Sequence, residues 1–279
     1  MKPICRNILT VMTTLCLLSL VSVAQAQVAF PDKNLETVIR DVLRKTDVNV
    51  ALTEDDLMNV FILKAKGKEI ADLTGLDKCP NLAELNLAGN KVVELAPLAG
   101  LKNIQSLNLA GNQIKDVAAL AQLQKLQYLN LEGNQIEAVD GLAGLNKLSA
   151  LYLSKNKLTA IAPLAGLNKL ASLYLADNQI TDLAPLAGVT RVQSLDLRNN
   201  QIADVAALSA MTDLRYTQLQ GNKVTDLAAL VAMAKKDAEG DKRFAPYWRL
   251  YLAGNPLSDA AKGAQVAELK AFGVRVTIE

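Results

Sequence analysis

Along most of the chain, leucine and other apolar residues alternate with polar residues in one unit of 22 residues. In residues 82–101 the unit reads LAELNLAGNKVVELAPLAGL. Leu85 and Leu87 are two residues apart and point to one side of a strand, so Glu84 and Asn86 point to the other side. An asparagine ends each strand, at Asn90, Asn112, Asn134, Asn156, Asn178, Asn200 and Asn222, and once more at Asn255. The pattern predicts short strands that repeat in register.

The second half of each unit predicts tight turns. Val92, Leu95 and Leu98 are three residues apart, a spacing that suits 3₁₀ turns. Each asparagine amide both donates and accepts, so it can bond backbone groups that the turning chain leaves unpaired. A period of roughly 20–29 residues with this order is typical of leucine-rich repeats. We therefore expect an α/β solenoid: a right-handed leucine-rich repeat horseshoe with a concave parallel sheet and 3₁₀ or short-helix turns on its convex side.

Non-repetitive stretches at both ends predict caps, because the outermost coils would otherwise expose their leucines. Residues 27–62 should form a helical N-terminal cap. Its first helix starts near Asp32 and carries apolar residues at helical spacing, namely Leu35, Val38, Ile39, Val42 and Leu43. Thr53 and Asp56 suit the start of a second, short helix.

Residues 63–246 should hold the repeats: a degenerate first coil with Lys68 in the asparagine position, then seven regular coils. The last interval, from Asn222 to Asn255, is eleven residues longer than the period, which places an insertion near 235–245. This insertion is either a tolerated surface loop or a specificity loop. Residues 247–279 should form the last repeat and a helix-strand C-terminal cap, for about nine coils in all.

The first 26 residues have the features of a secretory signal peptide. Lys2 and Arg6 precede a mostly apolar stretch, and Ala24-Gln25-Ala26 fits a cleavage site. An uncleaved membrane anchor is the alternative, although the stretch is short for a bilayer span. Cleavage leaves Cys79 alone, which we interpret as a core residue rather than part of an intermolecular disulfide. The expected location is the periplasm or the exterior of the cell, with no membrane span after cleavage.

Charge and composition exclude several function classes. Removing Lys2 and Arg6 from the 30 basic residues leaves 28, equal to the 28 acidic residues. A nucleic acid or an anionic membrane is therefore not expected as a partner, since both select a basic face. The chain has no histidine, which removes the commonest general base and metal ligand. No nucleophile elbow, phosphate loop or zinc spacing is present, so we expect no enzyme activity and no cofactor.

The repeat register predicts which side chains share the concave face. Five of the six tyrosines fall in the columns four and six residues before the asparagines. Tyr128, Tyr152 and Tyr174 come from adjacent coils, so they should form a cluster roughly 10 Å long. The propensity of tyrosine for sheets is the alternative explanation, but these columns hold no Val, Ile or Thr. The predicted partner-binding residues are Tyr128, Tyr152, Tyr174, Asp196, Arg198, Tyr216, Gln218 and Tyr251.

Another column lies four residues after the asparagine that ends each strand, or after Lys68 in the first coil. It holds Asp72, Glu94, Asp116, Asp182, Asp204 and Asp226. These acids open the convex turns, where a carboxylate can cap free backbone N–H groups. A calcium site is the alternative. Capping is favoured, because each coil supplies one carboxylate whereas calcium takes six to eight oxygen ligands, roughly.

The repeat unit, the run from Ile180 to Leu186 (ITDLAPL) and the cap that begins Phe30-Pro31-Asp32 resemble the internalin-type bacterial leucine-rich repeat proteins. The resemblance implies an extracytoplasmic binding protein that grips a protein ligand on its concave sheet. No immunoglobulin-like domain or anchoring tail follows the repeats, so we expect a free, monomeric module rather than an anchored adhesin. A structural or glycan-binding envelope protein that uses the same face is the alternative, and an enzyme built on the 235–245 insertion is less favoured.

Overall fold

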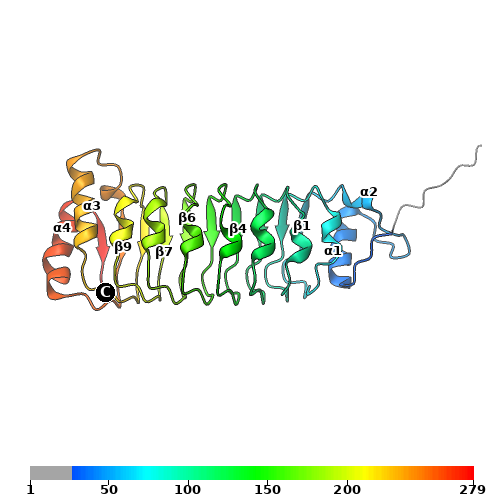
Figure 1. Cartoon of the computed structure of the whole chain (residues 1–279), viewed down its shortest axis with the longest axis horizontal. Helices are drawn as coiled ribbons and strands as arrows, with labels where there is room; N and C mark the ends of the chain where they lie inside the picture. Colours follow the sequence, from blue (N-terminus) through cyan, green and yellow to red (C-terminus); the bar gives the residue numbers. More distant parts are fainter. Residues whose placement is uncertain (1–26) are drawn as a thin grey trace, which may run out of the picture.

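The computed structural model describes residues 27–279, and the expected signal peptide, residues 1–26, lies outside them. One parallel sheet runs through the described chain, with its strands in sequence order (Figure 1). The sheet has ten strands, one more than the nine coils expected from the sequence, because the C-terminal strand extends it. The strands are β1 Ile62–Lys64, β2 Glu84–Asn86, β3 Ser106–Asn108, β4 Tyr128–Asn130, β5 Ala150–Tyr152, β6 Ser172–Tyr174, β7 Ser194–Asp196, β8 Tyr216–Gln218, β9 Arg249–Tyr251 and β10 Arg275–Thr277.

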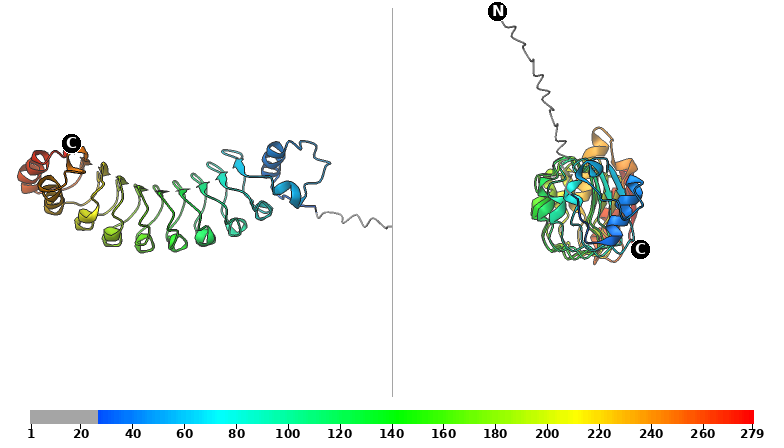
Figure 2. Two further views of the ribbon diagram at one scale, coloured as in Figure 1. Left: turned by 90° about the horizontal axis from the view of Figure 1, so that it is seen from above. Right: turned by 90° about the vertical axis from the view of Figure 1, so that its right-hand side faces the viewer.

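Each coil lies in register on the next, so that equivalent residues pair across the sheet. Leu107 faces Leu129, for example, and Leu129 faces Leu151. The leucines of this column and of the column two residues later are buried in one continuous core. Figure 2 shows the stack bent into a shallow arc, with the strands on the inner side and the turns on the outer side. The leucine-rich repeat horseshoe expected from the sequence is confirmed.

The asparagines form the expected ladder inside the coils. The amide of Asn134 donates to the carbonyl of Leu131 in its own coil at 2.9 Å and to that of Leu109 in the preceding coil at 3.0 Å. Its Oδ1 accepts from the backbone N–H of Ile114, also in the preceding coil, at 3.0 Å. The same three bonds recur for the other ladder residues, including Asn255. Each amide therefore ties its coil to the one before it.

Short 3₁₀ turns line the convex side: η1 Leu76–Lys78, η2 Ala96–Leu98, η3 Ala118–Gln122, η4 Asp140–Leu142, η5 Ala162–Leu164, η6 Ala184–Gly188 and η7 Ala206–Ala210. Pro97, Pro163 and Pro185 stand within the first turns of η2, η5 and η6, where proline costs no hydrogen bond. Aspartates cap the chain as it enters these turns. Asp116, for example, accepts from Ala118 N at 2.8 Å, whereas Glu94 makes no such bond among residues 27–279. The remaining caps come from Asp72, Asp182, Asp204 and Asp226.

Helices α1 (Lys33–Leu43) and α2 (Glu54–Leu57) cover the N-terminal coil. Asp32 caps α1 through Asn34 and Leu35, and its second oxygen accepts from Ala71 N at 2.8 Å, which fastens the helix to the first coil. Thr53 and Asp56 form the expected capping box of α2.

The sequence analysis placed one residue of α1, Val42, on the apolar face, and this prediction is wrong. Val42 is 41% exposed, and Arg40 is buried instead. The guanidinium of Arg40 donates to three backbone carbonyls, those of Lys45, Asp47 and Val50, so it holds the loop that follows the helix. A buried charge is tolerated when hydrogen bonds satisfy it in this way.

At the C-terminal end, α3 (Ala228–Glu239) replaces the 3₁₀ turn of the last full coil. The turn η8 (Ala245–Tyr247) follows it, and after β9 the helical segment η9 (Ala261–Gln265) continues into α4 (Val266–Ala271). Trp248 is fully buried there, and its indole N–H donates to the hydroxyl of Thr217 at 2.9 Å. Thr217 occupies the leucine position of β8, so the substitution in the repeat supplies an acceptor for the tryptophan of the cap.

Cys79 is fully buried under the first coil, as expected for a core residue. Burial, with a smaller contribution from the charge of Asp77, raises the pKa of its thiol to about 12. The thiol is therefore protonated and unreactive at neutral pH.

Candidate functional site

Three tyrosines form a stack on the concave face, where β4, β5 and β6 lie side by side. The rings of Tyr152 and Tyr174 are parallel to within 7°, with their centroids 4.6 Å apart. The ring of Tyr128 meets that of Tyr152 at 5.4 Å and a tilt of 46°. All three side chains are half-buried, so the stack offers apolar ring surface together with polar hydroxyls. Burial, and then the neighbouring phenols, raise the pKa of Tyr152, so its hydroxyl stays protonated at neutral pH.

An ion pair adjoins this stack on β7. Asp196 faces Tyr174 in the sheet register and is only 3% exposed. Arg198 donates to it through two nitrogens, at 2.9 and 2.7 Å. Because the fork of Arg198 is bidentate and the carboxylate is buried, the pair fixes the position of an exposed guanidinium beside the tyrosines.

The other three predicted residues lie further toward the C-terminal end. Gln218 and Tyr251 are register partners on β8 and β9, and they continue the column that contains Tyr174 and Asp196. Tyr216 is on β8 too, but it belongs to the parallel column two residues earlier and pairs with Arg249. The eight residues thus fall on one face, with the tyrosine stack at its middle and Tyr216 and Tyr251 toward one end.

A further column, two residues before each asparagine, lies beside these two columns and is partly buried. Ala88 and Ala176 are 8% and 2% exposed, and Ser154 is also buried. These residues lie two positions before the asparagines, where the chain already turns toward the core. Arg198 belongs to the same column but is exposed, so this column contributes to the accessible surface only in some coils.

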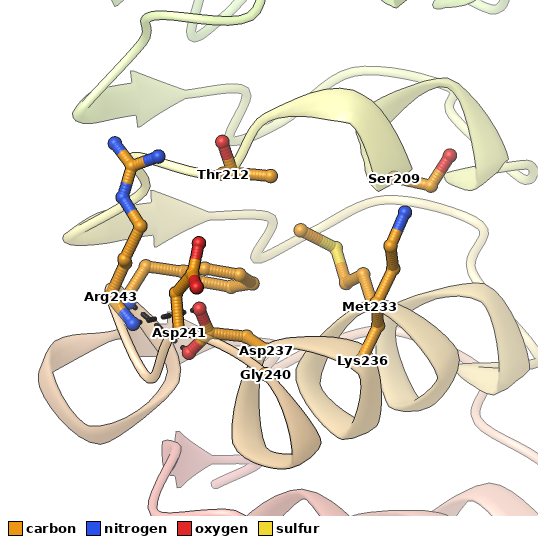
Figure 3. A pocket seen from close by; sticks show the side chains of 9 residues that line it. Ser209, Thr212, Met233, Lys236, Asp237, Gly240, Asp241 and Arg243 are labelled. Carbon is orange, nitrogen blue, oxygen red and sulfur yellow. Dashed lines mark hydrogen bonds between the residues drawn. The ribbon is translucent and has the colours of Figure 1, made fainter.

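The insertion near 235–245 encloses a cavity of about 240 Å³ on the convex side, between α3 and η7. Figure 3 shows Lys236 and Asp241 pointing across it toward Ser209 and Thr212. Asp237 accepts backbone N–H groups of Arg243, Phe244 and Ala245, at 2.8, 3.2 and 2.9 Å. Its carboxylate therefore anchors the loop.

A second hollow, of about 590 Å³, lies at the C-terminal end of the sheet and was missed by the sequence reasoning apart from Tyr216. Its lining consists of Arg215, Tyr216, Tyr247, Arg249 and Arg275. The repeat register places Arg249 beside Tyr216. Arg275 could be found only by recognising that the final strand joins the same sheet.

No group of three histidine, cysteine or acidic side chains within residues 27–279 is arranged to hold a metal ion. In the same residues, every helix is too short or too polar to cross a membrane.

Sequence comparison finds the same repeats. The family described as Leucine Rich repeats (2 copies) matches residues 102–144 and 146–188, and a single Leucine Rich repeat matches residues 191–209. No curated protein sequence matches the chain.

Among solved structures, internalin C2 of Listeria monocytogenes is 30% identical, with a TM-score of 0.71. The match covers 92% of this chain and 99% of that one. A leucine-rich repeat protein of Leptospira interrogans is 24% identical over 80% of this chain and 50% of its own, with a TM-score of 0.57. The ectodomain of the Arabidopsis thaliana receptor kinase GASSHO1/SCHENGEN3 is 18% identical over 81% of this chain and 28% of its own, with a TM-score of 0.63. The similarity to the Leptospira and Arabidopsis proteins is a similarity of fold.

Proposed function

We propose that this chain, which belongs to the internalin-type leucine-rich repeat proteins, is an exported, non-enzymatic module that binds a protein ligand on the concave face of its sheet. Leucine-rich repeat proteins are commonly protein-binding scaffolds. The location of the site on the concave face, export and the monomeric state are our inferences. Export rests on the signal-like sequence of residues 1–26.

The observation that carries the proposal is the stack of Tyr128, Tyr152 and Tyr174. Stacking restricts the ring torsions before any ligand arrives, so little side-chain entropy remains to be lost on binding. Arg198, fixed by Asp196, places a charged donor at the edge of the apolar rings. Aromatic rings beside an oriented arginine are the composition that most often dominates the binding energy of protein interfaces.

A double substitution, Tyr152→Ala with Tyr174→Ala, tests the site. The mature chain would be immobilised and its partner captured from native envelope extract, with the captured proteins identified by mass spectrometry. We expect the variant to lose the captured partner. Its free energy of unfolding should fall by no more than about 1.5 kcal/mol, since only half-exposed ring contacts are removed.

The matched control is Thr159→Ala with Thr181→Ala, which changes exposed residues seven positions further along the same two coils. Capture should be unaffected. A tyrosine variant that retained the partner would refute the concave site. A glycan array with the same proteins separates the alternative, because sugar binding that depends on the tyrosines would assign the face to a glycan instead.

A further inference from the structure

The hollow at the C-terminal end of the concave sheet has a different chemistry from the tyrosine stack. Arg249 lies between Tyr216 and Arg275 in the register of β8, β9 and β10. Arg215 precedes β8, and Tyr247 closes the side formed by η8. Three guanidinium groups and two phenol rings therefore line one hollow of about 590 Å³. We call these five residues the arginine groove.

No carboxylate among residues 27–279 forms an ion pair with the three arginines of the groove. Nearby arginines differ, since Arg198 pairs with Asp196 and Arg243 pairs with Asp213. Arg249 and Arg275 are neighbours on adjacent strands, and Arg215 immediately precedes β8, so three like charges that lack an ion pair within the described chain line one hollow and repel one another. The result is a local positive potential on a chain whose predicted mature form has no net charge.

The phenol rings orient two of the guanidinium groups. The guanidinium carbon of Arg215 lies 4.8 Å from the centroid of the Tyr247 ring, and that of Arg249 lies 5.4 Å from the Tyr216 ring. Contact with a ring occupies one face of a guanidinium and leaves its N–H edge free to donate. Trp248 stands between Tyr247 and Arg249 in the sequence. Its side chain is buried and anchors this segment. The donors are thus held in place before a ligand binds.

We propose that the arginine groove binds a carboxylate-rich segment of the protein ligand, an inference that rests on the proposed function. Free guanidinium edges bind carboxylates through two parallel hydrogen bonds. Adjacent parallel strands set Arg249 and Arg275 about 4.8 Å apart, and alternate side chains of an extended peptide are spaced about 7 Å apart. The two spacings differ by about 2 Å, which the flexible arginine and glutamate side chains can span, so acidic residues at alternate positions of a peptide can each reach one arginine.

The extent of the charge favours a peptide over a nucleic acid. The arginines are confined to β9, β10 and the residue before β8, and the neighbouring column contains the uncharged Gln218, Tyr251 and Thr277. A nucleic acid backbone carries a charge at every nucleotide and is bound along an extended basic track. The groove is instead sized for two or three carboxylates.

Fluorescence anisotropy with a fluorescein-labelled hexaglutamate peptide tests the groove. We expect the mature protein to bind this probe at low ionic strength, and the double variant Arg249→Gln with Arg275→Gln to bind it at least about tenfold more weakly. The variant Arg249→Lys with Arg275→Lys keeps the charge but loses the planar fork, and should bind about threefold more weakly or worse. Circular dichroism confirms that each variant is folded.

The matched control is Lys169→Gln with Arg191→Gln, which removes the same charge from two exposed positions outside the groove. Its affinity for hexaglutamate should equal that of the unmodified protein. Equal weakening of both double variants, absence of probe binding, or full affinity of the lysine variant would each overturn the proposal. Tighter, groove-dependent binding of single-stranded DNA of equal charge would also overturn it, in favour of a nucleic acid.

The two proposals fail separately. If hexaglutamate does not bind but the tyrosine double variant still loses its captured partner, only the arginine groove is refuted. If the tyrosine double variant still captures the partner, the proposed binding site on the concave face is refuted, whatever the result with hexaglutamate.

Discussion

Two columns of side chains run along the coils four residues apart, and they differ in how much they vary. The inner column repeats one residue, the ladder asparagine, in all eight coils from Asn90 to Asn255. The outer column changes from coil to coil: Asn86, Asn108, Asn130, Tyr152, Tyr174, Asp196, Gln218 and Tyr251. The outer column is the last residue of each strand, and the inner column lies in the bend that follows it. Each column keeps its own position in every coil, so position along the coil does not by itself explain why only the outer column varies.

The surroundings of the two columns explain it. Each inner asparagine meets the same carbonyls and the same N–H group of the coil before it, so one side chain satisfies every coil. Each outer residue meets its neighbours in the column and the solvent, and many side chains suit that position. The inner column therefore fixes the stacking of the coils, and the outer column is free to specify a ligand.

The largest effect is expected from removing one ladder amide. Asn134→Ala leaves the buried N–H of Ile114 without an acceptor. It also removes one of the two amide bonds that each of the carbonyls of Leu109 and Leu131 accepts, the other coming from the neighbouring ladder asparagine. We expect the free energy of unfolding to fall by about 4–5 kcal/mol, measured by urea denaturation.

Asn130→Ala is the matched comparison, because it changes the same residue type in the same coil. Asn130 accepts one bond, from Glu132 N at 2.9 Å, and is half-exposed. Its loss should cost about 1 kcal/mol or less. Similar losses for the two variants would show that the inner column is not what holds the coils together.

A second contrast concerns alkaline pH. The pKa of Cys79 is raised to about 12 in the folded chain, from 9.0 when solvated. Below pH 9 the thiol is neutral in both states; as the pH rises toward 12, only the unfolded chain ionises, so stability is lost. The fall over this interval should be about 3–4 kcal/mol.

Cys79→Ala should flatten that fall, as seen in urea titrations repeated across the interval. Tyr152→Phe is the comparison on the open face. The pKa of Tyr152 is also raised, chiefly by burial, but the side chain remains half-exposed, so its removal should alter the alkaline profile less. An unchanged profile in Cys79→Ala would mean that the first coil admits solvent to the thiol.

The sequence alone predicts nearly all of this architecture, because a repeat converts local spacing into long-range pairing. Knowing that Leu107 and Leu129 are one period apart is enough to pair them in the sheet. The caps were less completely predicted. Val42 fits the helical spacing of α1 but is exposed, since the first coil covers only part of that helix. The spacing of apolar residues shows which face of a helix is apolar, but it does not show how much of that face the neighbouring coil covers.

The sequence predicted which residues share the concave face, but it did not predict how their side chains are arranged. The register shows that Tyr152 and Tyr174 are neighbours, but the stacking of their rings depends on side-chain torsions that no spacing encodes. The arginine groove was missed because Arg275 lies outside the repeats and reaches the sheet through β10. The repeat period predicts which side chains of different coils lie together. It does not predict the contacts of cap residues such as Arg275, because the cap has no period.

Thr217 tests how the cap depends on a departure from the repeat. It stands where the other coils have leucine, and its hydroxyl accepts the indole N–H of Trp248. Thr217→Val keeps the shape and leaves the indole N–H buried without an acceptor. The free energy of unfolding should fall by about 1–2 kcal/mol. Thr181→Val, on the exposed surface, should change it by less than about 0.5 kcal/mol.

The smallest effect is expected on the convex edge, where the acidic residues that open the turns are more exposed than either column. Asp116 accepts from Ala118 N at 2.8 Å and is exposed, so Asp116→Ala should cost about 0.5–1 kcal/mol. Glu94 holds the equivalent place one coil earlier without that bond, because its longer side chain does not close the same turn, and Glu94→Ala should be neutral within error. Thermal denaturation of the two variants side by side measures the difference. Equal midpoints would show that solvent replaces the cap at no cost, and that only the inner column carries the stability of the repeat.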